Sequence, residues 1–327
     1  MRRRIIPALA LAGAVTMGFA SIAWASGTAR LDARASSARG PDAAAFPVSV
    51  RSGDGTVRIA DRPTRILSLS PSATEMLYAI GAGRQVVGVD KYSTWPPNAP
   101  RTSFTGYETS AEDYLPKHPD LVILAFNTGH LVAQLQKLHI PTLVLAPAST
   151  IADAEDQIVE LGAATGHASG AKTAVSGING DLTRVVHSVG DHGRGATYYV
   201  EIDQTYYSAT SKTFIGALFS RFKMVNIADA ASRTGSAYPQ LSAEYVIKAN
   251  PDYVFLADTV CCGQSAKTFA ARPGFSVLRA VRLGHVIAVN DSVASEWGPH
   301  SMERFVSVIE KAITETNKAN VTSSSGT

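Results

Sequence analysis

The segment "SAEYVIKANPDYVFLAD" (Ser242–Asp258) repeats the earlier segment "SAEDYLPKHPDLVILAF" (Ser110–Phe126) without gaps, at an offset of 132 residues. The two share Ser, Ala and Glu at the start, Pro-Asp in the middle, and Val, Leu and Ala near the end. Each is typical of a short helix capped by serine, a Pro-Asp turn and a buried strand. A match that runs through helix, turn and strand predicts two related lobes.

Apolar, strand-like runs alternate with helical stretches along the chain, which is typical of an α/β protein with mostly parallel strands. The expected strands are Ile66–Ser70, Val86–Asp90, Leu121–Phe126, Thr142–Ala146, Thr197–Ile202, Tyr253–Ala257 and Val286–Asn290. Residues 167–193 carry apolar side chains at helical spacing and predict one long connecting helix. We therefore expect an N-terminal lobe over 47–166 and a C-terminal lobe over 194–316, with a ligand cleft between them at the carboxyl ends of the strands.

The composition is consistent with two globular lobes and argues against a nucleic-acid-binding protein. The chain has 327 residues, 45% hydrophobic and 17% charged, which is enough for two lobes that each bury a core. The formal net charge is +3, and Arg2, Arg3 and Arg4 account for it. Because the rest of the chain is near neutral, we expect no nucleic-acid partner.

Both ends of the chain differ from the lobes. Three arginines, an apolar run from Ile5 to Ala25 and the small-residue site Ala23-Trp24-Ala25 predict a secretory signal over 1–25 and an exported protein. The alternative is an uncleaved anchor, since the run is long enough to span a bilayer. No cysteine directly follows the apolar run, so a lipid anchor is not expected. Residues 26–46 are predicted to be a flexible leader, and 317–327 a disordered tail.

Aromatic residues gather in the loops that follow the expected strands. As a group they predict a cleft for a large, flat, partly apolar ligand, although any single ring could instead cap a lobe core. The candidate ligand-binding residues are Tyr92, Trp95, Tyr107, Phe126, Tyr206, Tyr207, Tyr238 and Trp297. Apart from Lys91, these loops are short of basic residues, which favours a corrinoid over a strongly anionic ferric siderophore. Haem is a further alternative, with His130, His300 or a tyrosine as iron ligand.

The only cysteines, Cys261 and Cys262, are adjacent. Exported proteins meet oxidising conditions, so we expect these two to bond to each other. Such a pair could form a rigid edge of the cleft that touches ligand, or could only stiffen its loop. A reduced pair without a ligand role is the other alternative. A metal site is not expected, because no nearby pair of histidines would complete it.

Several segments together resemble one family. "RILSLSPSATEMLYAIGAGRQVVGVDKYSTWPP" (65–97), "SAEDYLPKHPDLVILAF" and "YPQLSAEYVIKANPDYVFL" (238–256) resemble the periplasmic binding proteins of iron-siderophore, haem and cobalamin ABC importers, in which a rigid helix joins two lobes. The resemblance extends from about Arg58 to Ile313. The Ser-Pro-x-x-Thr-Glu segment and the Tyr-Ser-x-aromatic-Pro-Pro loop are most similar to the cobalamin-binding members.

The resemblance implies a non-enzymatic receptor outside the cytoplasm that delivers a small-molecule ligand to a membrane permease. Its partners would be this permease and, through it, the ATPase of the importer. We expect a monomer without a resident cofactor. The resemblance also implies that Glu75 and Glu244 dock onto arginines of the permease. For Glu75 a local role is the alternative, because Ser72 and Glu75 have the spacing of a capping box.

The competing class is an exported hydrolase. No Gly-x-Ser-x-Gly elbow is present. "SGAK" (Ser169–Lys172) matches a Ser-x-x-Lys pair, but it lies in the expected connecting helix and lacks its companion motifs. No phosphate-binding loop is present, so ATP use would belong to a partner subunit.

Overall fold

The computed structural model describes residues 46–53, 55–108, 110–232 and 235–324. The expected signal segment 1–25 lies outside the described residues, as does the leader 26–46 except for Phe46. In the described part of the chain, no helix is both long and apolar enough to cross a membrane.

The N-terminal lobe is built on a parallel sheet with the order β4-β3-β5-β6. Its strands are β3 (Ile66–Leu69), β4 (Val86–Val89), β5 (Leu121–Leu124) and β6 (Thr142–Val144). The helices are α1 (Pro71–Ala79), η1 (Ala82–Gln85), η2 (Ala111–Lys117), η3 (Thr128–His130), α2 (Leu131–Lys137) and α3 (Ile151–Thr165). An antiparallel hairpin of β1 (Val48–Ser52) and β2 (Gly55–Ile59) precedes the sheet.

The C-terminal lobe has a second parallel sheet, with the order β10-β9-β7-β8. Its strands are β7 (Thr197–Glu201), β8 (Val225–Asn226), β9 (Tyr253–Leu256) and β10 (Val286–Ala288). The helices are α5 (Phe214–Arg221), α6 (Ile227–Ala231), α7 (Ala243–Ala249), α8 (Ala266–Ala270), η4 (Phe275–Val277), α9 (Arg279–Arg282), α10 (Asp291–Ser295) and α11 (Pro299–Ser324).

The two sheets have the same connectivity, which confirms the repeat. In each sheet the first strand lies between the second and the third, and the fourth lies beyond the third. The aspartate of the Pro-Asp turn makes the same pair of hydrogen bonds in both lobes. Asp120 accepts hydrogen bonds from the amide and hydroxyl of Thr64 at 2.7 and 2.8 Å, and Asp252 accepts the same pair from Thr197 at 2.8 and 2.9 Å. Each aspartate thereby fixes the start of the first strand of its lobe.

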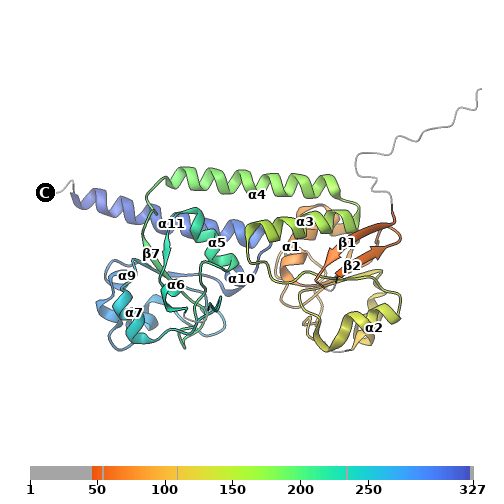
Figure 1. The fold of residues 1–327 in the computed structure, drawn as a ribbon, viewed down its shortest axis with the longest axis horizontal. Helices are drawn as coiled ribbons and strands as arrows, with labels where there is room; N and C mark the ends of the chain where they lie inside the picture. Colours follow the sequence, from red (N-terminus) through yellow and green to blue (C-terminus); the bar gives the residue numbers. More distant parts are fainter. Residues whose placement is uncertain (1–45, 54, 109, 233–234, 325–327) are drawn as a thin grey trace, which may run out of the picture. The chain divides into compact units, whose positions relative to one another are not determined.

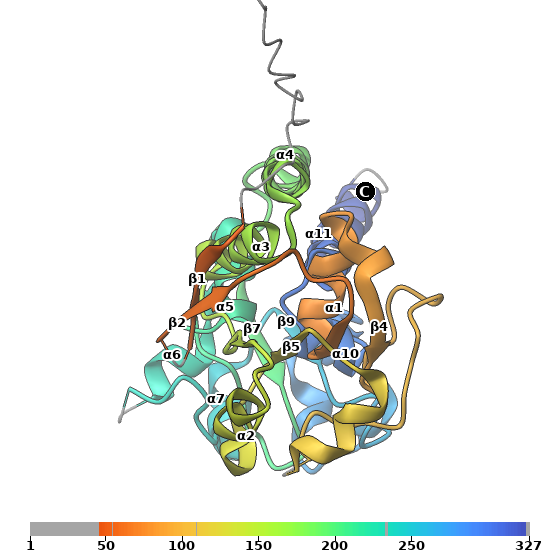
Figure 2. The same cartoon turned by 90° about the vertical axis from the view of Figure 1, so that its right-hand side faces the viewer.

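One helix, α4 (Ala168–Val189), joins the lobes within the range expected for it. It lies beside α3 and α11 on one side of the two sheets (Figure 1; Figure 2). A single hydrophobic core runs through this layer and into both lobes, from Ile66 and Met76 to Phe219, Phe255 and Phe305. Shared packing of this kind gives the lobes a common support and limits how far they move apart.

The end of the chain differs from the expectation. We predicted a disordered tail over 317–327, but α11 continues to Ser324. No glycine or proline lies between Asn317 and Ser324, so nothing interrupts the backbone hydrogen bonding of the helix. Residues 325–327 are outside the described part.

Candidate ligand cleft between the lobes

A cleft of about 610 Å³ opens between the lobes at the carboxyl ends of their strands. In the N-terminal lobe its lining includes Ser70 after β3, Asp90 after β4 and Phe126 after β5. In the C-terminal lobe it includes Ile202 after β7 and Ala257 after β9. This is where the α/β pattern places a ligand, and the volume lies within the range of small-molecule sites, roughly 300 to 1,000 Å³.

Four aromatic side chains line the cleft and remain exposed within it. Tyr92 is 48% exposed, Tyr107 56%, Phe126 44% and Tyr238 52%. Tyr107 and Phe126 stack with their ring centroids 6.3 Å apart, while Tyr238 comes from the opposite lobe. Large apolar surfaces left uncovered in one concave site are typical of a site that a partly apolar ligand covers.

Trp297 lines the cleft, but its surroundings indicate a structural role. It is only 9% exposed. Its backbone amide donates to the Ser72 hydroxyl at 3.0 Å, and its indole Nε1 donates to the Gln157 side chain at 2.7 Å. Both partners belong to the N-terminal lobe, so Trp297 connects the lobes at the base of the cleft.

The structure places three expected aromatics outside the cleft. Trp95 stacks on His300, with ring centroids 3.9 Å apart, in a separate groove beside α4 and α11. Tyr206 packs against Phe275 and under the Arg272 guanidinium. Tyr207 forms a bridge with Gln240 rather than lining the cleft. A strand end predicts which loops approach the cleft, but the backbone conformation of each loop decides which rings point into it.

Acidic residues are the site members that the sequence prediction missed. Apart from tyrosines, the ionisable side chains among the described residues of the lining are Asp90, Asp291 and Glu296, with no Lys, Arg or His. Asp90 ends a predicted strand, so its position gave a usable signal. Lys91 lies with its Nζ over the Tyr92 ring, 4.9 Å from the centroid. His130 and His300, the suggested iron ligands, do not line the cleft.

The environments of these carboxyl groups differ. Burial raises the pKa of Asp90, with a smaller contribution from the negative charge of Glu108, although Ser93 donates its amide to this carboxylate at 2.7 Å. Asp291 accepts from the amides of Val260 and Cys261 at 2.9 and 2.6 Å. These amides belong to the loop after β9, so that loop fixes one wall of the cleft.

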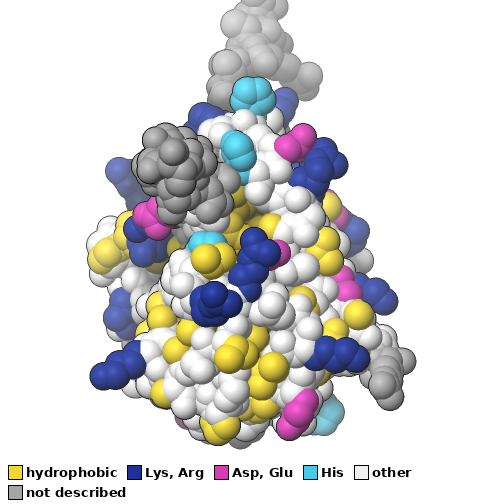
Figure 3. Space-filling model, turned by 90° about the vertical axis from the view of Figure 1, so that its left-hand side faces the viewer, with side chains coloured by type: hydrophobic (Ala, Val, Ile, Leu, Met, Phe, Trp, Pro, Cys, Tyr) yellow, Lys and Arg dark blue, Asp and Glu magenta, His cyan; other side chains and the backbone are white. Residues whose placement is uncertain are grey.

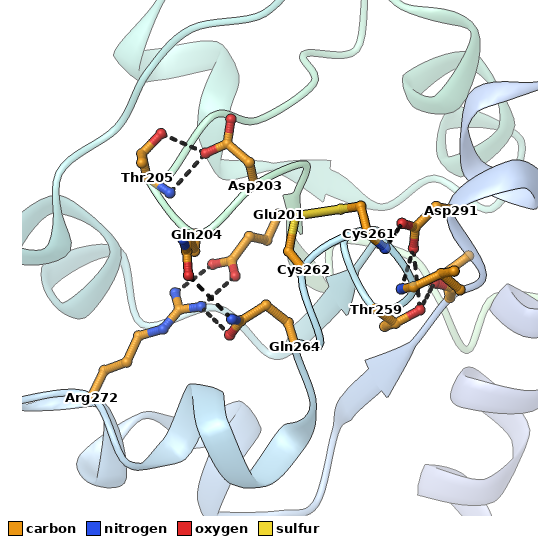
Figure 4. Close-up of a disulfide and its surroundings, with 12 residues drawn as sticks. Glu201, Asp203, Gln204, Thr205, Thr259, Cys261, Cys262, Gln264, Arg272 and Asp291 are labelled. Carbon is orange, nitrogen blue, oxygen red and sulfur yellow. Dashed lines mark hydrogen bonds and ion pairs between the residues drawn. A yellow bond between two sulfur atoms is a disulfide. The ribbon is translucent and has the colours of Figure 1, made fainter.

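The Val260–Cys261 loop also holds the cysteine pair. Cys261 and Cys262 are joined by a disulfide, and both residues are exposed. Figure 4 shows the bond next to Asp291 on one side and to the Glu201–Arg272 pair on the other. Neither cysteine lines the cleft itself. The disulfide is connected to the cleft lining through the backbone amide of Cys261, which donates to Asp291.

The environment of Glu75 is inconsistent with both roles expected for it, docking and capping. Glu75 is 3% exposed, so it does not form a surface charge for docking. It also does not form a capping box with Ser72, because the N-cap of α1 lies two residues before Ser72. Ser70 is the N-cap and accepts from the amide of Ala73, while the Ser72 hydroxyl accepts from Trp297. The Glu75 carboxylate instead accepts from the amide and hydroxyl of Ser301, at 3.0 and 2.6 Å.

Glu244 has a different environment. It lies exposed in the first turn of α7, where Ser242 is the N-cap. Hydrogen bonds from its own amide and from Ser242 lower the pKa of its carboxyl group. It is therefore an accessible negative charge.

The fold and the cleft define a two-lobed solute-binding protein. Residues 66–293 match the family of periplasmic binding proteins, and the chain belongs to this family. A cobalamin-binding protein of Halobacterium salinarum is 30% identical over 273 residues, which are 80% of this chain and 73% of that protein. YvrC of Bacillus subtilis, an uncharacterised ABC transporter substrate-binding lipoprotein, is 27% identical over 283 residues, 84% of this chain and 88% of its own.

A solved structure shares the fold. It is that of a possible iron-binding, periplasmic solute-binding protein of Staphylococcus epidermidis, with a TM-score of 0.69 and 23% identity. The similarity covers 77% of this chain and 99% of that chain.

Proposed function

We propose that the protein captures a corrinoid in the cleft and delivers it to the permease of an ABC importer. The observation that carries this proposal is the combination of four exposed aromatic rings with a lining that holds carboxyl groups and, among its described residues, no basic side chain. A flat, partly apolar ligand gains from the rings. A polyanionic ferric siderophore would meet Asp90 and Asp291 without a compensating cation.

Haem is the second candidate, because one observation favours it. Three tyrosines, Tyr92, Tyr107 and Tyr238, line the cleft, and a tyrosine phenolate can ligate haem iron. A histidine-ligated haem has no support from His130 or His300, which lie elsewhere. The cobalamin-binding relative of Halobacterium salinarum favours the corrinoid.

The ligand would leave the cleft at the membrane, with energy supplied by the ATPase of the importer. Glu244 supplies an exposed docking charge on the C-terminal lobe. We propose no reaction for the protein itself, since Ser169 and Lys172, the residues of the hydrolase alternative, lie on α4 rather than in the cleft. On the end of the C-terminal lobe, Lys and Arg side chains are scattered among uncharged and acidic ones (Figure 3).

Equilibrium titration by calorimetry tests the proposal. Cobalamin and cobinamide are expected to bind with one-to-one stoichiometry, and ferric siderophores to bind much more weakly. Tight haem binding with a tyrosinate spectrum, together with no corrinoid binding, would establish the second candidate instead. Turnover of ester or lactam substrates would contradict the non-enzymatic assignment.

A further inference from the structure

Two glutamates from different lobes lie close together at the cleft. Glu75 belongs to α1 of the N-terminal lobe, whereas Glu296 follows α10 and lines the cleft. Ser301, in the first turn of α11, lies between them. Its Oγ is 2.6 Å from Oε1 of Glu75 and 3.2 Å from Oε2 of Glu296.

The number of protons in this cluster decides its chemistry. A serine hydroxyl has one proton and can donate it to one acceptor, while its oxygen can accept a second hydrogen bond. Glu75 accepts from both the amide and the hydroxyl of Ser301, so the hydroxyl proton is used there. The contact between Ser301 and Glu296 then requires a proton on Glu296. We propose that Glu296 is protonated at neutral pH and that Glu75, Ser301 and Glu296 form a proton-dependent latch between the lobes.

A glycine allows the backbone to approach Glu75 closely. A Cβ atom at position 298 would collide with the Glu75 carboxylate, so Gly298 lets the backbone after α10 lie directly against it. In the described part of the chain, neither Glu75 nor Glu296 forms an ion pair. Without a cation, two neighbouring carboxyl groups retain a proton rather than both being ionised.

The charged groups around the latch are mostly acidic. Burial raises the pKa of Glu296 to about 9, and the negative charges of Glu75 and, more weakly, Asp90 act in the same direction. Apart from tyrosines, the other titratable groups that line the cleft with Glu296 or the groove with Glu75 are Asp291 on α10, Asp181 and Arg184 on α4, and His300, Glu303 and Glu310 on α11.

The sign of the pH effect follows from the raised pKa. An unfolded glutamate titrates near a pKa of about 4.3. Below that pH both states hold the proton and the latch contributes fully. As the pH rises towards 9, the unfolded state releases the proton first, so the contribution of the latch is lost. One retained proton makes the unfolding constant rise by up to about tenfold per pH unit in this window.

The test compares the full chain with Glu296→Gln, whose amide can donate to Ser301 at any pH. Urea unfolding at pH 6, 7, 8 and 9 should show the wild type losing stability relative to the variant, by up to about tenfold in the unfolding constant per pH unit. Asp258, which also titrates in this range, is present in both proteins, so its effect cancels. Glu244→Gln, at an exposed carboxyl group, should run parallel to the wild type. Parallel curves for Glu296→Gln and wild type would overturn the proposal.

Infrared spectroscopy keeps the proposal testable if Glu296→Gln does not fold. The wild type should show the carbonyl stretch of a protonated carboxylic acid at pH 8, and this band should vanish as the pH passes about 9. In Glu75→Gln the band should vanish at a lower pH, because a negative neighbour has been removed. Absence of the band at pH 8, or an unchanged titration in Glu75→Gln, would contradict the latch.

Discussion

The backbone amide of Trp297 donates to the hydroxyl of Ser72 at 3.0 Å, across the junction of the two lobes. Both residues are buried, and they are 225 positions apart. Ser72→Ala would leave the Trp297 amide without its partner. We expect a loss of about 1 to 3 kcal/mol in the free energy of unfolding, the cost of an unsatisfied buried donor. Urea denaturation measures it. Ser176→Ala, at an exposed site on α4, should change stability by less than about 0.5 kcal/mol.

The cleft aromatics should determine affinity without determining stability. Tyr238→Ala and Phe126→Ala should each weaken ligand binding by about 1 to 3 kcal/mol, because each removes a ring that a bound ligand covers. Both rings are about half exposed in the free protein, so the melting temperature should change little. Tyr207→Ala is the matched control, since Tyr207 is 40% exposed but outside the cleft. Equal loss of affinity in all three variants would argue against this cleft as the ligand site.

Local patterns predicted most of the fold. All seven expected strands are present, because each is a short apolar run bounded by turn residues. The connecting helix followed from its 3.6-residue periodicity, and the repeat followed from the gapless match of residues 110–126 with 242–258 through helix, turn and strand. The β1–β2 hairpin was not predicted, although Val48, Val50, Val57 and Ile59 alternate with other residues on either side of the sequence Gly-Asp-Gly.

The surroundings of Glu75 could not be predicted in the same way. Its spacing from Ser72 suggested a capping box, and the resemblance to periplasmic binding proteins suggested a docking charge. Neither indicates which side chains pack against Glu75 in the folded protein. The partner that decides its role is Ser301, 226 residues away. Likewise, the strand ends identified the cleft loops, but whether Trp95 turned towards the cleft or towards His300 depended on packing against α11.

Docking to the permease should depend on Glu244. Glu244→Arg should leave ligand affinity unchanged, because Glu244 lies outside the cleft. It should abolish stimulation of the importer ATPase, since a like charge at an interface costs several kcal/mol. Glu112→Arg changes the equivalent position of the first repeat, which is also exposed in the first turn of a serine-capped helix, and shows whether one lobe or both carry a docking charge. Normal uptake by the Glu244→Arg protein would exclude this residue from the docking surface.

The disulfide should affect its loop more than the fold. Mass spectrometry without reduction should find the peptide with Cys261 and Cys262 lighter by two hydrogens. Replacing both by serine should change the free energy of unfolding by less than about 1 kcal/mol, because a ring this small restricts the unfolded chain very little. Asp291 should stay in place, since it is bound by backbone amides. Labelling of both thiols in the native, air-oxidised protein would contradict the bond.

Asp258 should make the C-terminal lobe sensitive to pH. It follows β9, is fully buried, and neither carboxyl oxygen has a hydrogen-bond partner among the described residues. Burial raises its pKa to about 7, and the negative charge of Glu201 adds to the effect. The guanidinium of Arg272 donates two hydrogen bonds to the Glu201 carboxylate, at 2.7 and 2.6 Å, and none to Asp258.

The folded pKa of Asp258 lies above the unfolded value of about 3.9. Its contribution to stability is therefore complete below pH 4 and is lost as the pH rises through about 7. Asp258→Asn removes this proton linkage, so at pH 8 the variant should be more stable than the wild type by up to about 4 kcal/mol. At pH 4 the two should be nearly equal. Urea denaturation from pH 4 to pH 8 measures the difference. Asp203→Asn, at a partly exposed carboxylate on the next loop, should not reproduce it, and a difference for Asp258→Asn that stays constant with pH would show that Asp258 is ionised throughout.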